Sequence, residues 1–249
     1  MLKTERMDRV RAALRAQGLT QMIVCDPKSV WYLTGVAVEP YERLLALYLP
    51  TEGEPVLFLN RLFNVPEPPC RTVWHTDTDK PVAQIAEVVD AGRPLGIDKE
   101  WPAKFLIPLM ETHPGMQVVL SSDCVDDCRA CKDAEEQALM REASRINDAV
   151  NEAAKHYIKA GMTEREVAEF IDAQFRAHGC EGPSFTTIVS FGANAADPHH
   201  EPDGTVLKEG DCVLFDMGCV KSRYCSDMTR TWFCGQPTEK QAAVHDLVR

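Results

Sequence analysis

The spacing of apolar residues over the first 120 positions alternates between helical and strand patterns. Residues 4–17 carry Met7, Val10 and Leu14 at helical spacing, and Gly18 follows directly. Short apolar runs separated by turn residues have the length of strands, and helical patterns lie between the later ones. This alternation predicts an α/β layer structure in which helices cover a sheet. The expected strands are 22–25, 44–49, 56–59, 95–97 and 117–120, and the expected helices are 81–91 and 103–112.

The pattern changes after about residue 130. A long helical pattern covers 133–160 and ends at Gly161. Thr163 and Glu166 then have the spacing of a capping box, which predicts a second helix running to about residue 178. From residue 185 onward the residues favour strands, and Thr238 is placed to cap a last helix. We therefore expect two domains, 1–130 and 131–249.

Composition and charge exclude several classes of protein. Of 249 residues, 45% are hydrophobic and 26% are charged, which is ordinary globular usage. The net charge of −11 argues against a general nucleic-acid partner, because phosphate backbones repel an acidic surface. No apolar run approaches the ~20 residues that a membrane span needs, and the charged N-terminus has no signal core. We expect a cytoplasmic protein with no membrane partner, whose ten cysteines are mostly reduced, buried thiols.

Two aspartates stand at unusual places beside apolar strand patterns. Asp216 directly follows the apolar run 212–215, and Asp227 directly precedes a second strand pattern at 228–233. An antiparallel ribbon can bring both carboxylates to one face, where two divalent cations would offset their mutual repulsion. A pair of metals ~3.5–4 Å apart is a known device for activating water and polarising a carbonyl. Spacing alone leaves open the plainer alternative that both are turn or cap residues.

A loop before this ribbon carries paired histidines. In the segment 191–200, Gly192 and Pro198 restrict the backbone, and His199 and His200 follow. Histidines in a rigid loop can position a substrate or transfer a proton near neutral pH. A surface loop with incidental histidines fits the same residues.

Three motifs in order narrow these alternatives. They are GANAADPHHEP (192–202), LKEGDCVLFDMG (207–218) and YCSDMTRT (224–231). Together they resemble the pita-bread metallopeptidases, a family that includes Xaa-Pro aminopeptidases, prolidases and creatinase. WYLTG (31–35) and RACKDAEE (129–136) resemble that family's N-terminal domain and its linker. The fold implied is an α/β creatinase-type N-terminal domain (1–130) followed by the first half of an α+β pita-bread catalytic domain (131–249).

The resemblance implies a role for each site residue. Asp216 would be a metal ligand and Asp227 the carboxylate that bridges two metals, with Mn, Co or Zn as the divalent ions. His199 would contact the substrate and stabilise the intermediate, and His200 would be accessory at most. Thr229 and Arg230 would support the bridging carboxylate. The implied reaction is hydrolysis of the N-terminal peptide bond of short Xaa-Pro peptides, and family members are commonly homodimers.

The family's metal site also uses a histidine and two glutamates that this chain does not supply. The chain ends in the helix after the ribbon, and His245 in that helix lacks the family's Gly-His-Gly context. We therefore expect a fragment that holds half an active site and exposes an apolar face of its half-sheet, and activity of the chain alone is doubtful. Two alternatives stay open: a truncated, non-catalytic binding or dimerisation protein, and a metal-free creatinase-like amidinohydrolase.

Other candidate signals are discounted. Cys124, Cys128 and Cys131 have the spacing of an iron–sulfur motif but lie at the domain linker, so packing is the expected role. The acidic residues around 123–127 are expected to form a solvated linker. His75, like the other isolated histidines, is expected at the surface or a helix end.

Overall fold

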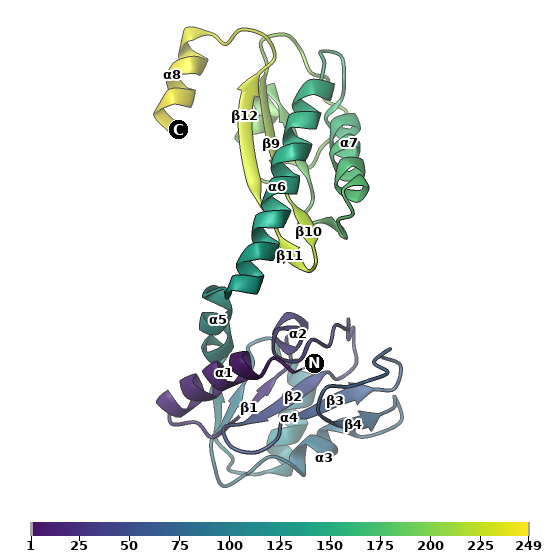
Figure 1. Cartoon of the computed structure of the whole chain (residues 1–249), viewed down its shortest axis with the longest axis vertical. Coiled ribbons are helices and arrows are strands. Elements are labelled where there is room, and N and C mark those ends of the chain that lie inside the picture. The colour runs from purple at the N-terminus through teal and green to yellow at the C-terminus, as the bar shows by residue number, and fades with distance from the viewer. Residues whose placement is uncertain (1, 249) are drawn as a thin grey trace. The chain divides into compact units, whose positions relative to one another are not determined.

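The computed structural model describes residues 2–248, and its internal contacts divide the chain into two units, 1–131 and 132–249. Figure 1 labels most of the elements of both units.

The first unit is built around a six-stranded mixed sheet with the strand order β4-β3-β2-β1-β5-β6. Its central strand β1 pairs antiparallel with β2 on one side and parallel with β5 on the other. The strands are β1 (Gln21–Val24), β2 (Ala46–Pro50), β3 (Val56–Asn60), β4 (Arg71–His75), β5 (Leu95–Ile97) and β6 (Val118–Leu120). The helices are α1 (Thr4–Ala16), α2 (Pro27–Thr34), α3 (Pro81–Ala86), α4 (Ala103–Thr112) and α5 (Asp123–Ala130).

Alternate residues of the central strands in this sheet enter two separate cores. Met22 and Val24 of β1 pack with residues of α1, α2 and α5, whereas Ile23 packs with residues of α3 and α4. Because successive strand residues point to opposite faces, a run that is apolar at every position needs helices on both sides. The unit is therefore the three-layer α/β structure expected from the sequence.

Several expectations for this unit are wrong in detail. Helix α3 ends at Ala86, not at residue 91, and strand β4 was not expected. Residues 123–130 form helix α5 where a solvated linker was expected, because Cys124 and Val125 are buried against α1 and α2. His75 is buried in β4 rather than at the surface, with its Nε2 3.1 Å from the carbonyl oxygen of Leu44.

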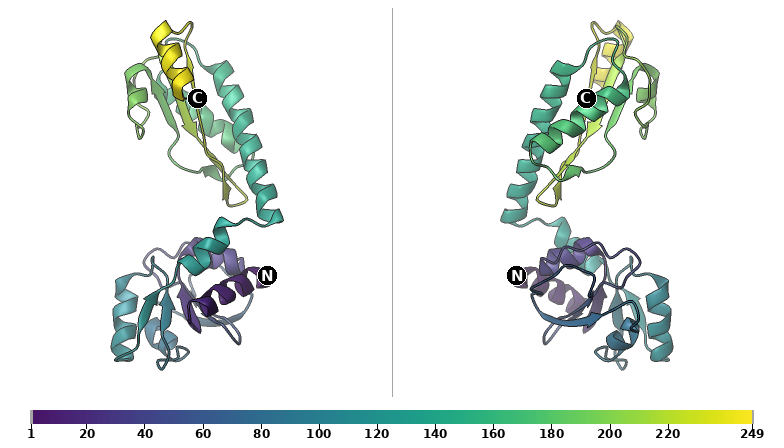
Figure 2. Two further views of the ribbon diagram at one scale, coloured as in Figure 1. Left: turned by 90° about the vertical axis from the view of Figure 1, so that its left-hand side faces the viewer. Right: turned by 90° about the vertical axis from the view of Figure 1, so that its right-hand side faces the viewer.

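The second unit packs two helices against one face of two small antiparallel sheets. The strand orders are β12-β9-β8 and β11-β10-β7. In Figure 2, α6 and α7 lie on one side of the strands, and α8 lies on the other. The helices are α6 (Ala134–Tyr157), α7 (Glu164–Ala177) and α8 (Glu239–Val248), with a 3-10 helix η1 (Gly192–Ala196). The strands are β7 (Gly182–Pro183), β8 (Ile188–Phe191), β9 (Cys212–Met217), β10 (Cys219–Lys221), β11 (Tyr224–Cys225) and β12 (Met228–Phe233).

The core of this unit takes every second residue of β9. Val213, Phe215 and Met217 are buried with apolar residues of α6 and α7. On the opposite face, Leu214 and Phe233 are half-buried. The expected capping box is confirmed, since Thr163 accepts the N–H of Glu166 while the Glu166 carboxylate accepts the N–H of Thr163.

Candidate functional site

The two predicted aspartates lie near the same end of the β9–β12 ribbon. Thr229 lies opposite Asp216 in the β9–β12 pairing, and Asp227 stands two residues before Thr229, next to the start of β12. Side chains two residues apart in an extended chain point the same way, and directly opposed residues share a face. Asp216 and Thr229 therefore lie on the face away from α6 and α7, and Asp227 directly precedes β12. The expected antiparallel ribbon is confirmed.

Thr229 fixes one carboxylate of this pair. Its hydroxyl donates a 2.8 Å hydrogen bond to Oδ1 of Asp216, which leaves Oδ2 of Asp216 for another partner. Asp216 is half-buried, whereas Asp227 is exposed. Thr229 and Arg230 were expected to support Asp227, and that partner was wrong. Thr229 supports Asp216, and Arg230 donates to the carbonyl oxygen of Thr229 at 2.9 Å.

The connection between the two aspartates is tightly packed. Ser226 donates its N–H to the carbonyl of Cys219 at 2.9 Å, and its hydroxyl accepts the N–H of Cys219 at 3.0 Å. The buried amide of Asn147 on α6 donates to the carbonyl of Met217 at 2.9 Å. A Cβ at Gly218 would collide with the backbone of Ser226 and the hydroxyl of Ser184. The spacing of Asp216 and Asp227 therefore depends on a glycine at position 218.

His199 lies in the loop between β8 and β9. Its N–H donates to Oδ1 of Asp197 at 3.0 Å, and its side chain is exposed. The adjacent His200 points elsewhere, because its Nε2 lies 2.7 Å from Oε2 of Glu164 at the start of α7. The two histidines that the sequence offered as a pair thus have different surroundings, one exposed and one held by a buried carboxylate.

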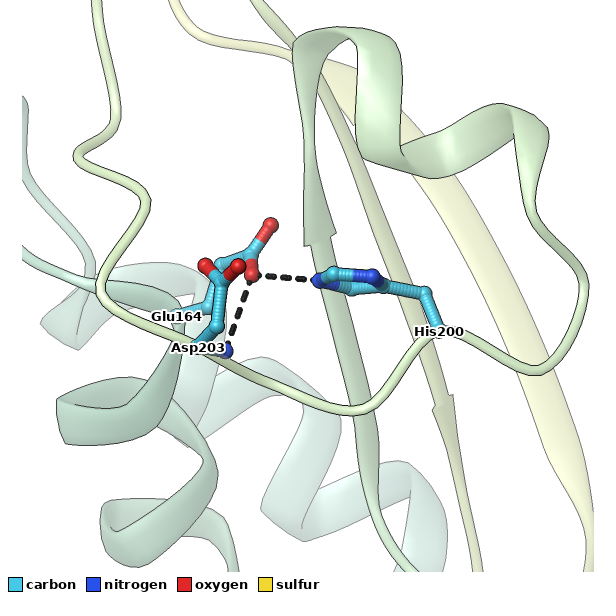
Figure 3. A group of neighbouring side chains, drawn as sticks. All are labelled: Glu164, His200 and Asp203. Atoms are coloured by element: carbon cyan, nitrogen blue, oxygen red, sulfur yellow. Dashed lines mark hydrogen bonds and ion pairs between the residues drawn. The ribbon is translucent and has the colours of Figure 1, made fainter.

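Glu164 and Asp203 complete a cluster that the sequence analysis missed (Figure 3). One ligand atom from each of Glu164, His200 and Asp203 lies within 4.8 Å of the others. The hydroxyl and then the N–H of Thr205 lower the pKa of the Asp203 carboxyl below its ordinary value. Glu164 directly follows the capping Thr163, in the first turn of α7. Acidic residues are common in the first turn of a helix, so the sequence position of Glu164 does not predict that it is buried.

The two groups of possible metal ligands differ in how many of their carboxylate oxygens already accept hydrogen bonds. The Glu164 carboxylate already receives N–H donors, among them the backbone N–H groups of Phe191 and Asp203. A cation there would face those hydrogens. Asp216 keeps one free oxygen, and within residues 2–248 no hydrogen bond occupies the carboxylate of Asp227. Hard carboxylate oxygens are suitable donors for divalent cations, so the aspartate pair fits a metal better than the Glu164 cluster does.

Other candidate residues stay outside any such group. Within the described chain, the three clustered cysteines 124, 128 and 131 belong to no set of three neighbouring metal-ligating residues. The His245 ring lies 6.1 Å from the ring of Phe233. No described helix is both long and apolar enough to cross a bilayer.

Comparison with known proteins supplies the family. Residues 6–131 match the creatinase/prolidase N-terminal domain, and residues 138–249 match metallopeptidase family M24. A putative dipeptidase, YkvY of Bacillus subtilis, is 30% identical over 98% of this chain and 69% of its own length. A peptidase of Staphylococcus aureus is 32% identical, and the match covers 90% of this chain but only 65% of that relative.

A solved structure gives the same result for the fold. The prolidase of Thermococcus sibiricus superposes with a TM-score of 0.90 at 29% identity, covering 100% of this chain and 70% of the prolidase. The chain thus spans about two thirds of the length of the proteins it resembles. The two family matches follow one another along the chain and together cover nearly all of it. The chain therefore belongs to the M24 metallopeptidases with a creatinase/prolidase N-terminal domain.

Proposed function

We propose that this chain carries part of the active site of a metal-dependent peptidase that hydrolyses the N-terminal peptide bond of Xaa-Pro dipeptides or short peptides. The observation that supports the proposal is the ribbon register, which pairs Asp216 with Thr229 and puts Asp227 two residues before Thr229, where a continued strand would point its side chain to the same face. The similarity to a putative dipeptidase and to a prolidase supports the reaction class.

The residues have distinct proposed roles. Asp216 and Asp227 would hold divalent cations, with Mn, Co or Zn as the candidates. When bound, such cations activate water and polarise the scissile carbonyl. Thr229 keeps the Asp216 carboxylate oriented through its 2.8 Å hydrogen bond. The exposed ring of His199 is free to bind the substrate carbonyl as negative charge develops on it.

Metal binding is the first test, because it does not depend on turnover. Calorimetric titration of the chain with Mn²⁺, Co²⁺ and Zn²⁺ would be repeated on Asp216→Asn and Asp227→Asn. The matched control is Asp148→Asn, which removes an exposed acid from α6 in the same unit. We expect both ribbon variants to weaken binding at least ~10-fold, since each removes a charged ligand, and the control to bind as the unchanged chain does. Equal binding in all four proteins would refute the assignment, and no binding in any would favour the metal-free amidinohydrolase.

Hydrolysis is the second test. Proline release from Xaa-Pro dipeptides would be compared with cleavage of Xaa-Ala dipeptides, using the chain alone. A second sample would join the chain to the part of YkvY that has no counterpart in it. Metal-dependent proline release that disappears in Asp227→Asn is the expected result. Metal binding without cleavage in either sample would favour a non-catalytic binding protein.

A further inference from the structure

The start of α7 holds a fully buried carboxylate whose hydrogen bonds all reach the loop that follows β8. Glu164 has no exposed surface. We infer that Glu164 is a positioning residue that fixes the conformation of residues 192–203, and through it the place of His199. The role of Glu164 in catalysis rests on the proposed function, but the hydrogen bonds that hold the loop do not.

The first oxygen of Glu164 holds the beginning of the loop. Oε1 accepts the N–H of Phe191 at 2.7 Å, where β8 ends, and the side-chain amide of Asn194 at 3.0 Å. Phe191 is itself buried. Without this acceptor its N–H would be a buried donor with no partner, which is costly.

The second oxygen holds the far end of the loop. Oε2 lies 2.7 Å from Nε2 of His200 and accepts the N–H of Asp203 at 3.1 Å. As a hydrogen bond to this carboxylate oxygen, the contact uses the His200 tautomer that carries its proton on Nε2. His199 thus lies directly before a side chain that is fixed by Glu164.

The backbone of α7 adds further attachment to the same segment. The N–H of Glu164 donates to the carbonyl of Thr205 at 3.1 Å, and the N–H of Arg165 donates to the carbonyl of Asp203 at 3.2 Å. These bonds hold Asp203 at the end of the loop and Thr205 just after it, whereas the Glu164 side chain reaches both ends of the loop. A buried charge is tolerated only with such partners, so its removal should disturb the loop first.

The test is hydrogen exchange followed by mass spectrometry on Glu164→Gln. Glutamine has one acceptor oxygen, and its NH₂ group would face two N–H donors. We expect exchange at Phe191 and Asp203 to rise by about 10-fold, the factor that matches one lost hydrogen bond, while α6 stays protected. The matched control is Glu166→Gln, which lies on the same helix turn but binds only Thr163. In Glu166→Gln, residues 192–203 should exchange at the same rate as in the unchanged chain.

A second variant keeps the test decisive if Glu164→Gln does not fold. His200→Ala removes one of the four donors and leaves the other three. It should raise loop exchange in the same direction but less, and it should add little further effect in the Glu164→Gln background. Unchanged loop exchange in both variants, or exchange that rises equally through α6 and β9, would overturn the inference.

Turnover separates this inference from the proposed function. In a sample that cleaves Xaa-Pro dipeptides, Glu164→Gln should lower kcat by about 10-fold or more, the scale of a misplaced catalytic group, with a smaller change in KM. Glu166→Gln should leave both parameters unchanged. If no sample cleaves the substrate, the proposed function fails, while the exchange result still decides the role of Glu164. If kcat is unchanged although the loop exchanges faster, Glu164 does not position His199 for catalysis.

Discussion

Replacing Gly218 by alanine should loosen the ribbon that carries both proposed metal ligands. An added Cβ would collide with the carbonyl of Ser226 and the hydroxyl of Ser184, and it would lie 2.8 Å from the carbonyl carbon of Ser226. Backbone atoms cannot rotate away as a flexible side chain can. Overpacking of this kind costs about 1–3 kcal/mol, and the reduced freedom of the unfolded chain returns about 0.4–1 kcal/mol. We expect a net loss of about 1–2 kcal/mol in the free energy of unfolding of residues 132–249.

The control is Gly204→Ala in the same unit. Nothing lies within 4 Å of a Cβ built there, and the backbone is outside the left-handed region. It should be neutral or stabilising by up to about 1 kcal/mol. Both variants would be unfolded in urea while hydrogen exchange of peptides from β9 and β12 is followed, so that the first unit does not contribute. If Gly218→Ala unfolds at the same urea concentration as Gly204→Ala, the close packing argued for the ribbon is refuted.

Two further predictions concern titratable groups. The N–H and hydroxyl of Thr163 lower the pKa of Glu166 below its ordinary value of 4.5, so its stabilising contribution is present above 4.5 and is lost as the pH falls through the folded value. Glu166→Gln keeps the side-chain cap but does not titrate. The difference between its urea midpoints at neutral and acid pH should therefore be smaller than in the unchanged chain, and an equal difference would contradict this prediction. Burial raises the pKa of the Cys180 thiol to about 12, whereas Cys131 and Cys225 are exposed. Ellman's reagent at neutral pH should therefore modify Cys131 and Cys225 quickly, and Cys180 only after unfolding; equal rates for Cys180 and Cys225 would contradict the buried placement.

Local patterns predicted helices well where periodicity and stop signals agree. The expected helix at 103–112 coincides with α4 (Ala103–Thr112). Strand β4 was missed because it lies at the sheet edge and is mostly only partly buried, so its sequence has little apolar alternation. Helix α5 was missed because its acidic residues favour a solvated segment, whereas Cys124 and Val125 pack into the first unit's core and Asp126 pairs with Lys99.

The sequence by itself determined the family and the two-part fold, and it predicted a common face for Asp216 and Asp227. These depend on motif order and on the two-residue period of strands, which are local properties. The tertiary structure decided which side chains support the site. Glu164 reads locally as an ordinary first-turn acid, and Thr229 reads as a partner of its neighbour Asp227. Their hydrogen-bond partners, the loop 191–203 and Asp216, are distant in sequence and become neighbours only when α7 and β12 pack against the rest of the unit.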